Sequence, residues 1–426
     1  MNILILGSGG REHALAHQIA KSPLCTKLFV APGNGGTNEI AVNVPLAIND
    51  FEKIADFALT TDVQLIIVGP EEPLVNGIVN YFKENEALQR IAILGPDKTG
   101  AQLEGSKAWA KSFMASEGIP TAAYREFTNK TRNEGIHYLD NCNLPIVLKA
   151  DGLAAGKGVI ITSDRDEAKE NFKAMLDGMF GHAGNTIVIE QFLAGIEFSM
   201  FVITDGKDYI LLPEAKDYKR IGEGDTGPNT GGMGAVSPVP FLDDVLAEKV
   251  HTQIIKPTLN GLQKRNIDYR GFIFFGLINV NGDPFVIEYN CRMGDPETEV
   301  VIPRIKSDLV PLFLGAANGH LPPELPEVTH ETAATIMLVA QGYPGPYKKG
   351  NPITGTELVH ESLVFHAGTL LNETLQTNGG RVMALTSFGM NIQDAINKSL
   401  KAAELVHFEG KNYRKDIGKD LLIFEK

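Results

Sequence analysis

The chain has 426 residues, of which 43% are hydrophobic and 21% are charged, a balance typical of a globular protein with about two to four domains. Its formal net charge of -13 argues against a polyanionic partner, so we expect no nucleic-acid binding. No apolar run approaches the roughly 20 residues that a membrane-spanning helix needs, and the start, MNILILGSGG, lacks the basic region of a signal peptide. Cys25, Cys142 and Cys291 are widely spaced, which suggests a reducing compartment, and we expect a cytoplasmic protein without a membrane partner.

The first motif is a strand, a glycine turn and a helix. Asn2–Leu6 is a buried-strand run, GSGGREH follows it, and Glu12–Ala20 has the pattern of a helix, so the turn can bind an anion. The dinucleotide pattern G-x-G-x-x-G fails, because its third glycine falls at Glu12 and the next strand, Leu28–Val30, has no acidic residue after it. We therefore favour a phosphate or phosphoribosyl group, paired with Arg11, over NAD; a tight turn without a ligand is the alternative.

Two further buried strands, Gln64–Val68 and Ile91–Leu94, alternate with helical segments and predict an open α/β domain with a parallel sheet. Ligands gather at the carboxyl ends of such strands, where Asn34 and Glu71 lie. Glu71 can accept hydrogen bonds from ribose hydroxyls, or it can simply be a carboxylate at a helix start.

The stretch Ile146–Ile161, IVLKADGLAAGKGVII, predicts two strands joined by a glycine loop. Lys149 ends the first strand and Lys157 lies in the loop, so the hairpin can fold over a polyphosphate. It is not a Walker A loop, because GKG leads into a strand and not into a helix. An ordinary surface hairpin with a basic tip is the alternative, and residues 124–195 form a strand-rich unit around it.

A second nucleotide feature follows this hairpin. Glu190 and Glu197 flank a turn, so backbone groups at Gln191–Leu193 can bind an adenine edge while Glu197 holds ribose hydroxyls. Either glutamate alone is more often a surface charge. Lys107, at an expected helix start, offers a further phosphate contact or is a solvent-facing lysine.

Residues 216–238 are too rich in glycine and polar side chains to pack as a core element and too long for a routine connection. We therefore expect a substrate-binding loop that includes Asp217.

The next pattern is a hairpin with strands at Gly271–Asn279 and Pro284–Tyr289. On an extended strand, Glu288, Asn290 and Arg292 project to one face. This set fits Mg²⁺ on nucleotide phosphates with an arginine clamp on the transferring group, although a paired salt bridge on a sheet face is the plain alternative.

From about Glu331 the pattern is that of short strands followed by a helix at Asn391–Val406. It predicts a small closing α+β domain. Gly379, Gly380 and Arg381 can reach the active site, or the glycines form a tight turn.

Taken together, Lys107, LKADGLAAGKG, the Glu190–Glu197 hinge and IEYNCR resemble the ATP-grasp ligases. More closely, GSGGREHA, APGN, VGPEEPLVNG, QLEGSK, DTGPNTGGMGAVSP, IEYNCRMGDPET and TNGGRV resemble the glycinamide ribonucleotide synthetases, in the same order from residue 2 to about 425. The resemblance implies an ATP-grasp fold in an α/β protein. Its domains would be an N-terminal open parallel-sheet (pre-ATP-grasp) domain at 1–105, an ATP-grasp domain at 106–330 with 124–195 as a mobile lid, and a small α+β domain at 331–426.

The resemblance also implies a reaction. ATP, with Mg²⁺ or Mn²⁺, phosphorylates the carboxylate of glycine, and the amine of 5-phospho-β-D-ribosylamine attacks the glycyl phosphate. The products are glycinamide ribonucleotide, ADP and phosphate, in the second step of purine synthesis. We expect a monomer whose partners are these small molecules, with a transient contact to the enzyme that supplies phosphoribosylamine.

The family's site residues carry over to matching positions of this sequence. ATP would contact Lys107, Lys149, Gly156, Lys157, Gly158, Glu190, Leu193 and Glu197. The substrates would contact Gly9, Gly10, Arg11, Asn34, Glu71, Asp217, Arg292, Gly294 and Asp295. The metal ligands would be Glu288 and Asn290, and the catalytic residues Lys149, Asp217 and Arg292.

One position departs from the wider ATP-grasp pattern. Many members carry an acidic metal ligand where this chain has Gly276, so water or Glu299 is expected to take its place. The rival interpretations are a non-catalytic nucleotide-binding module, an NAD oxidoreductase, and another ligase of the superfamily such as a phosphoribosyl-aminoimidazole carboxylase.

Overall fold

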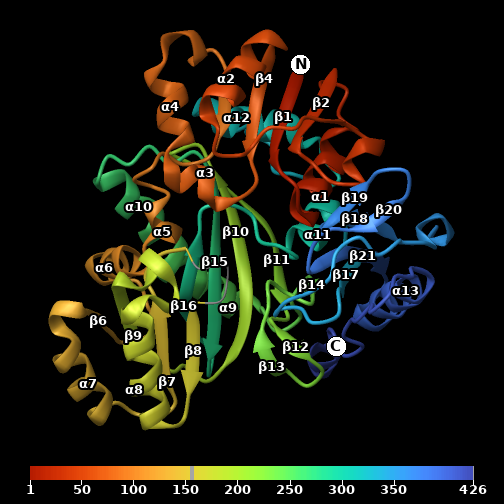
Figure 1. Ribbon diagram of the computed structural model, residues 1–426. Helices are drawn as coiled ribbons and strands as arrows, with labels where there is room; N and C mark the ends of the chain where they lie inside the picture. Colours follow the sequence, from red (N-terminus) through yellow and green to blue (C-terminus); the bar gives the residue numbers. More distant parts are fainter. Residues whose placement is uncertain (154–157, 426) are drawn as a thin grey trace.

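The computed structural model describes residues 1–153 and 158–425. Figure 1 shows the N-terminal region at the top, a smaller unit with two helices at the lower left, and the C-terminal region on the right of a large central sheet. Among the described residues, no helix is long and apolar enough to cross a membrane.

The N-terminal region is an open parallel sheet of five strands in the order β3-β2-β1-β4-β5. The strands are β1 (Asn2–Gly7), β2 (Lys27–Pro32), β3 (Val42–Asn43), β4 (Val63–Val68) and β5 (Ala92–Leu94). The helices here are α1 (Gly10–Ile19), α2 (Phe51–Thr60), α3 (Glu71–Asn76), α4 (Ile78–Glu84) and α5 (Gln102–Gly105). The predicted parallel α/β architecture is therefore confirmed.

Alternate residues of β1 explain how this sheet is covered. Leu4 and Leu6 pack with α2 and α4, whereas Ile3 and Ile5 pack with α1 and with α12 (Leu309–Asn318). Both clusters also contain residues of the central sheet, such as Phe275 and Phe274, so the N-terminal sheet and the central region share two apolar cores.

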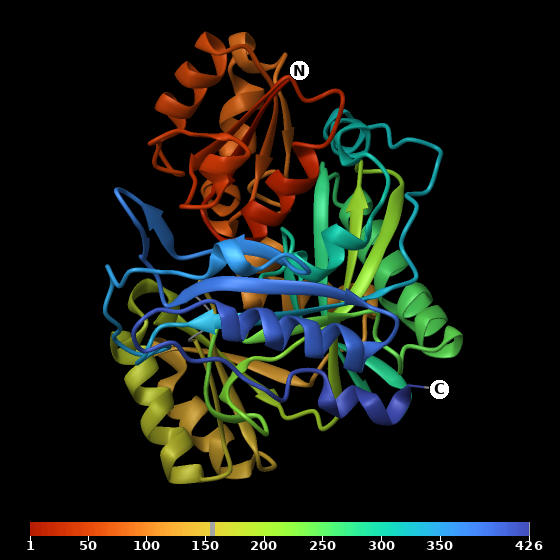
Figure 2. The ribbon, with the colours of Figure 1, turned by 90° about the vertical axis from the view of Figure 1, so that its right-hand side faces the viewer.

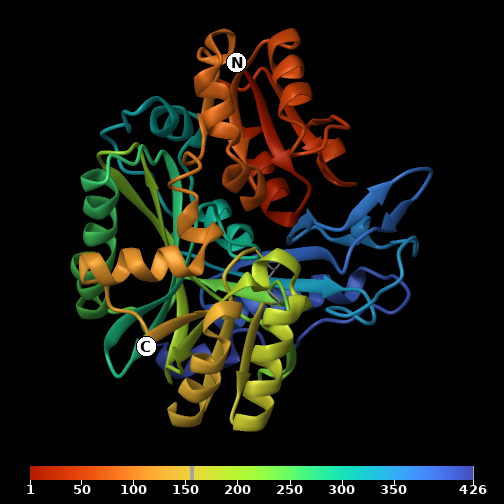
Figure 3. The ribbon, with the colours of Figure 1, turned by 60° about the vertical axis from the view of Figure 1, so that its left-hand side comes forward.

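The smaller unit is a four-stranded antiparallel sheet in the order β6-β9-β7-β8 with two helices on it (Figure 3). Its elements are β6 (Tyr124–Thr128), α7 (Arg132–Asn141), β7 (Ile146–Ala150), β8 (Val159–Thr162), α8 (Arg165–Ala174) and β9 (Thr186–Gln191). It has its own apolar core, with Phe127 and Phe172 at the centre. The predicted hairpin is β7 and β8; Gly158 lies at its closed end, while Gly156 and Lys157 lie outside the described residues.

The central sheet has eight strands in the order β16-β15-β10-β11-β14-β17-β21-β18. Their bounds are β10 (Ile196–Thr204), β11 (Tyr209–Asp217), β14 (Gly234–Ser237), β15 (Gly271–Val280), β16 (Asp283–Asn290), β17 (Thr332–Val339), β18 (Leu363–His366) and β21 (Arg381–Gly389). Short ribbons are β12 (Arg220–Gly222) with β13 (Thr226–Asn229), and β19 (Thr369–Leu371) with β20 (Leu375–Thr377). Other helices are α6 (Lys107–Glu117), α9 (Asp244–Val250), α10 (Lys256–Lys264), α11 (Thr298–Val301) and α13 (Ile392–Leu405).

This sheet crosses the expected boundary near residue 330. The segment 216–238 was expected to be a loop, and this prediction was wrong in part: β11 ends within it, β12 and β13 form a short ribbon, and Gly234–Ser237 is the fully buried strand β14. It pairs with β11 on one side and β17 on the other and so joins the two halves of the sheet. The predicted C-terminal helix is confirmed as α13, which packs along β17 and β21 (Figure 2).

The predicted hairpin is confirmed as β15 and β16. Asn281 and Gly282 both have positive φ at its turn, which suits an Asn-Gly connection. However, β16 ends at Asn290, so Arg292 lies beyond the strand and does not share a strand face with Glu288 as the sequence had suggested.

Candidate active site

The turn between β1 and α1 is closed by a carboxylate of its own helix. The Gly9 backbone N–H donates to Glu12 Oε2 at 2.6 Å, and Arg11 Nε donates to Glu12 Oε1 at 2.6 Å. A Cβ at Gly7 or Gly69 would collide with the Glu12 side chain, which is buried. Glu12 thus fills the space between the ends of β1 and β4 and the start of α1. This capping also explains why α1 starts at Gly10, two residues before the predicted start.

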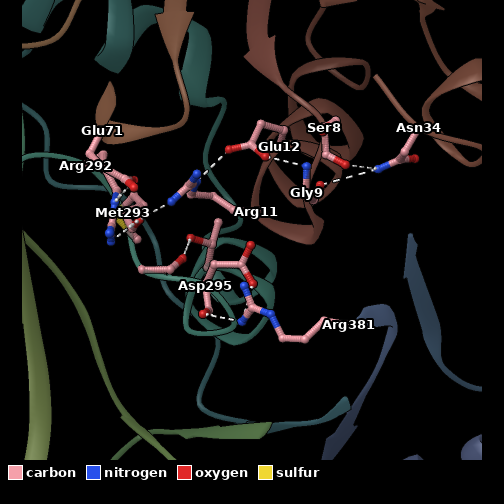
Figure 4. A network of polar contacts seen from close by, with 12 residues as sticks. Ser8, Gly9, Arg11, Glu12, Asn34, Glu71, Arg292, Met293, Asp295 and Arg381 are labelled. Atoms are coloured by element: carbon pink, nitrogen blue, oxygen red, sulfur yellow. Dashed lines mark hydrogen bonds and ion pairs between the residues drawn. The ribbon is translucent and has the colours of Figure 1, made fainter. Parts of the chain in front are cut away.

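Asn34 joins three loops instead of presenting its amide to an open site. Its side-chain amide donates to Ser8 O at 2.9 Å and to His366 O at 2.8 Å, while its Oδ1 accepts from the N–H groups of Gly36 and Thr37. Figure 4 shows its place beside Gly9. The predicted substrate residue Asn34 therefore holds the N-terminal turn against β18, and its polar atoms are used within the protein.

Arg292 lies between the carboxylates of Glu71 and Glu104, both from the N-terminal region, and Figure 4 shows Arg292 beside Glu71. Its Nε is 3.2 Å from Glu71 Oε2, and its Nη2 is 2.5 Å from Glu104 Oε1. Burial acts to raise the pKa of Glu71, but Arg292 and Arg11 outweigh it and lower this pKa to about 2. Arg11 Nη1 donates to Met293 O at 3.2 Å, so the predicted residues Arg11, Glu71 and Arg292 do come together.

A second arginine binds the loop after β16. Arg381 Nη1 is 2.9 Å from Asp295 Oδ1 and donates to Asp295 O at 2.7 Å and to Gly231 O at 2.5 Å. It thereby connects the loop around Asp295, the segment 216–238 and β21. Gly294 has no room for a Cβ because Glu297 packs against it.

Asp217, at the end of β11, and the buried Glu297 are two carboxylates whose charges influence each other. Burial and the nearby Asp217 raise the pKa of Glu297 to about 8, and burial likewise raises the pKa of Asp217. Glu297 Oε1 accepts from Ser199 Oγ at 3.3 Å, and Lys219 is 2.8 Å from Glu197 Oε2. Each negative charge therefore opposes ionisation of the other carboxyl group.

A buried carboxylate flanked by two lysines lies under the glycine hairpin. Glu190 Oε2 is 3.0 Å from the Nζ of both Lys149 and Lys111, and these three side chains are nearly inaccessible to solvent. Glu190 Oε1 is buried without a hydrogen-bond partner among the described residues. Lys107 Nζ lies 3.4 Å from Gly152 O, at the entrance to the loop. Leu193 is half-buried in the connection between β9 and β10.

The expected metal ligands Glu288 and Asn290 lie near the end of β16, both half-buried. Gly276 is directly opposite Glu288, and Ser199 is directly opposite Gly276 on the other side. The expectation that Glu299 replaces an acid at Gly276 finds no support, because Glu299 lies against Gly10 of α1. The carboxylate that bonds Ser199 is Glu297. Within 1–153 and 158–425, no three His, Cys, Asp or Glu side chains form a ready-made metal cluster.

Glu104 and Lys111 contact the predicted site residues Arg292 and Glu190, and Glu297 influences Asp217, although the sequence did not point to these three. Two of them had a signal, since Glu104 stands in QLEGSK and Glu297 in CRMGDPET, motifs that were noted without assigning these residues. Lys111 had none beyond its helical spacing from Lys107.

Comparisons with known proteins agree along the whole chain. Three family models match in order: phosphoribosylglycinamide synthetase N domain at residues 1–104, ATP-grasp (A) domain at 105–298, and C domain at 333–420. The chain is 48% identical to the phosphoribosylamine–glycine ligase of Pasteurella multocida, over 100% of this chain and 99% of that protein. It is 46% identical to the enzyme of the same name from Haemophilus influenzae, over 98% of both.

Solved structures give the same result. The crystal structure of phosphoribosylamine–glycine ligase from Thermotoga maritima matches with a TM-score of 0.84 and 36% identity, over 98% of this chain and 100% of that one. The biotin carboxylase domain of Hydrogenobacter thermophilus 2-oxoglutarate carboxylase matches with a TM-score of 0.72 at 16% identity, covering 100% of this chain and 98% of that one, which shows a shared fold alone. The chain has the ATP-grasp fold and belongs to the phosphoribosylglycinamide synthetase family.

Proposed function

We propose that this chain joins glycine to 5-phospho-β-D-ribosylamine with ATP, through glycyl phosphate, to give glycinamide ribonucleotide, ADP and phosphate. The family match over the whole chain supports this proposal. The observation that carries it is the position of Arg292, which follows the expected metal strand β16 and contacts Glu71 of the N-terminal region. One arginine is thus next to both the expected nucleotide site and the expected sugar site.

The ATP site would lie between the hairpin β7–β8 and β16. Lys107 and Lys149 supply charge for the phosphates, together with Gly156, Lys157 and Gly158 of the loop. Glu190, Leu193 and Glu197 would hold adenosine. The buried Oε1 of Glu190, which has no hydrogen-bond partner within 1–153 and 158–425, supports this role, because such an acceptor favours a ligand that brings an N–H or O–H group.

The residues present fit a divalent cation held jointly with nucleotide. Glu288 and Asn290 offer one carboxylate and one amide oxygen, too few for a cage built from protein alone. Mg²⁺ is commonly bound by one or two such groups plus phosphate oxygens and water, and Mn²⁺ takes similar ligands. When bound, the cation would neutralise charge on the phosphates.

The phosphoribosylamine would lie along the N-terminal turn, at Gly9, Gly10, Arg11, Glu71 and Asp295, with Asn34 holding that turn in place. Asp217 and Arg292 would hold the amino and carboxylate ends of glycine, or the acyl phosphate. Gly294 allows Glu297 to pack close to this region.

The chemistry needs no protein nucleophile. A carboxylate is a poor electrophile, and phosphoryl activation depends mainly on positioning and charge neutralisation. The acyl phosphate must be protected from water. A lid made of residues 124–195, with its own apolar core, can move as a unit and close over it.

We place the enzyme in the cytoplasm, where its three free thiols would remain reduced. We expect a monomer that makes a transient contact with the enzyme that supplies phosphoribosylamine.

The deciding experiment is an ADP-release assay with glycine and freshly prepared phosphoribosylamine, each omitted in turn. Stoichiometric ADP and glycinamide ribonucleotide should form only in the complete mixture. Full ADP release with bicarbonate and an aminoimidazole ribonucleotide in place of these substrates would identify a carboxylase of the same superfamily instead.

A further inference from the structure

Glu104 is a buried carboxylate that bonds the two residues after the expected metal strand. Its Oε2 accepts the backbone N–H of Cys291 at 2.8 Å and the thiol of Cys291 at 3.2 Å. Its Oε1 accepts Nη2 of Arg292 at 2.5 Å. The side chain is 6% exposed. One carboxylate thus fixes the backbone where β16 ends and the side chain that follows it.

These contacts leave Arg292 with a defined set of free donors. A guanidinium has five N–H groups. In the described part of the chain, Nε donates to Glu71, Nη2 to Glu104 and Nη1 to Met293 O. One N–H on each terminal nitrogen has no acceptor in that part of the chain, so both nitrogens can still donate to an anion.

Glu104 is also close in sequence to the base of the glycine loop. It lies in α5, and Ser106 and Ala108, just after it, both donate to Asp151 Oδ1, at 3.0 and 2.7 Å. The Lys107 N–H donates to Asp151 O at 3.1 Å. Asp151 is the residue that leads from β7 into the loop. A short segment of chain, 104–108, therefore connects Arg292 with the base of the lid hairpin.

We propose that Glu104 is a positioning residue for the ligation. It orients Arg292 toward the acyl group and holds Arg292 at a fixed position relative to Asp151, at the base of the glycine loop. This inference rests on the proposed function. A misplaced Arg292 would leave phosphorylation of the carboxylate possible but would hold the acyl phosphate poorly for attack by the amine. Loss of Glu104 should therefore uncouple ATP use from ligation.

The test compares Glu104→Gln with wild type. Glutamine keeps the size and an oxygen for the Cys291 N–H but presents no negative charge to Arg292. We expect kcat/KM for ligation to fall at least tenfold, the KM for ATP to stay within twofold, and the ratio of ADP to ligated product to rise above one. Glu104→Asp, which keeps the charge, should recover part of the coupling and serves as the test variant if Glu104→Gln does not fold.

The matched control is Glu117→Gln. Glu117 is another carboxylate with little exposure that bonds an arginine, Arg265 at 2.5 Å, but it lies at the far end of α6. The Glu117→Gln variant should have a lower melting temperature than wild type but the same ADP-to-product ratio. If Glu104→Gln likewise lowers only the melting temperature, with a ratio of one and unchanged KM values, Glu104 is merely structural and the inference is overturned.

A double-mutant cycle with Arg292→Lys tests the route of the effect. If Glu104 acts through Arg292, Glu104→Gln should cost at least threefold less in kcat/KM in the Arg292→Lys background than alone. Independent, multiplicative losses would contradict the inference. Wild-type protein that forms no ligated product would instead overturn the proposed function, and with it this role of Glu104.

Discussion

Gly276 and Glu288 are direct cross-strand partners in the β15–β16 ladder, and a Cβ at position 276 would come within 3.0 Å of the Glu288 Cγ. Along the row Ser199–Gly276–Glu288, only Glu288 carries a negative charge. The metal site that we propose would therefore take one carboxylate from this row.

Replacing the carboxylate of Glu288 should lower the turnover rate. We expect Glu288→Gln to keep the fold and nucleotide binding but to lower kcat tens-fold or more at saturating Mg²⁺, because transition-state charge loses its partner. Asp283→Asn, at the exposed start of the same strand, is the control and should leave kcat unchanged. Activity of Glu288→Gln within about twofold of wild type would show that the metal is held elsewhere.

The N-terminal turn gives a second prediction. Gly10 is buried, and a Cβ there would collide with the Glu299 carboxylate. Gly10→Val should therefore raise the KM for phosphoribosylamine at least tenfold, with the KM for ATP nearly unchanged. An equal loss of ATP affinity would place the nucleotide in the N-terminal region.

The cause of that loss can be separated from general damage. In Gly10→Ala the added methyl is small, and Glu299→Ala removes the group that it meets. We expect the double variant to bind phosphoribosylamine better than Gly10→Ala alone. No recovery would mean that the glycine is needed for the backbone itself.

Local patterns in the sequence were enough for the parts of the fold that are built from neighbours. The hairpins β7–β8 and β15–β16 follow from β-branched runs and from the turn residues between them, and their strands pair with each other. The parallel sheet follows from repeated strand–helix alternation.

Contacts between residues far apart in the chain could not be predicted from local sequence patterns. The strand β14 is short and lies in a glycine-rich stretch, and it is buried only because β11 and β17 pair with it from both sides. The bond between Glu104 and Arg292 joins residues 188 positions apart. Nothing in the spacing of either residue indicates the other, so the role of Glu104 required the structure.

The pair of lysines on Glu190 gives a third prediction. Glu190→Gln would keep the size of the side chain but remove the charge that Lys149 and Lys111 share. The two ammonium groups would then repel each other without an anion between them. If the amide NH2 takes the place of Oε1, the adenine would also meet a donor where an acceptor is expected. We expect the KM for ATP to rise about tenfold, or roughly 1.4 kcal/mol, with the KM for phosphoribosylamine unchanged.

The control for this variant is Glu134→Gln. Glu134 lies on the same four-stranded unit but is exposed, and its arginine partner is 3.7 Å away. It should leave both KM values as they are. Unchanged ATP binding in Glu190→Gln would mean that the adenosine does not contact this carboxylate.

The last prediction concerns pH and the contact between α1 and β18. His13 and His366 are buried there, and His13 Nδ1 accepts the backbone N–H of His366 at 2.8 Å. Burial, His366 and His17 lower the pKa of His13 to about 3, and burial lowers the pKa of His366 to about 4. Both rings are therefore neutral in the folded protein near pH 7.

In the unfolded chain these histidines should titrate near their ordinary pKa of about 6.5. The unfolded state then binds more protons than the folded state from pH 6.5 down to the folded pKa values of about 3 and 4, so stability is complete above this range and falls as the pH drops through it. For His13 alone, lowering the pH from 7 to 5 should reduce the free energy of unfolding by about 2 kcal/mol.

The measurement is urea unfolding at several pH values between 5 and 7.5. His13→Asn keeps an acceptor for the His366 N–H and should reduce the pH dependence by that amount, whereas His137→Asn, at an exposed position of α7, should not. An equal pH dependence in His13→Asn and wild type would mean that the ring is already protonated in the fold and that the α1–β18 contact tolerates its charge.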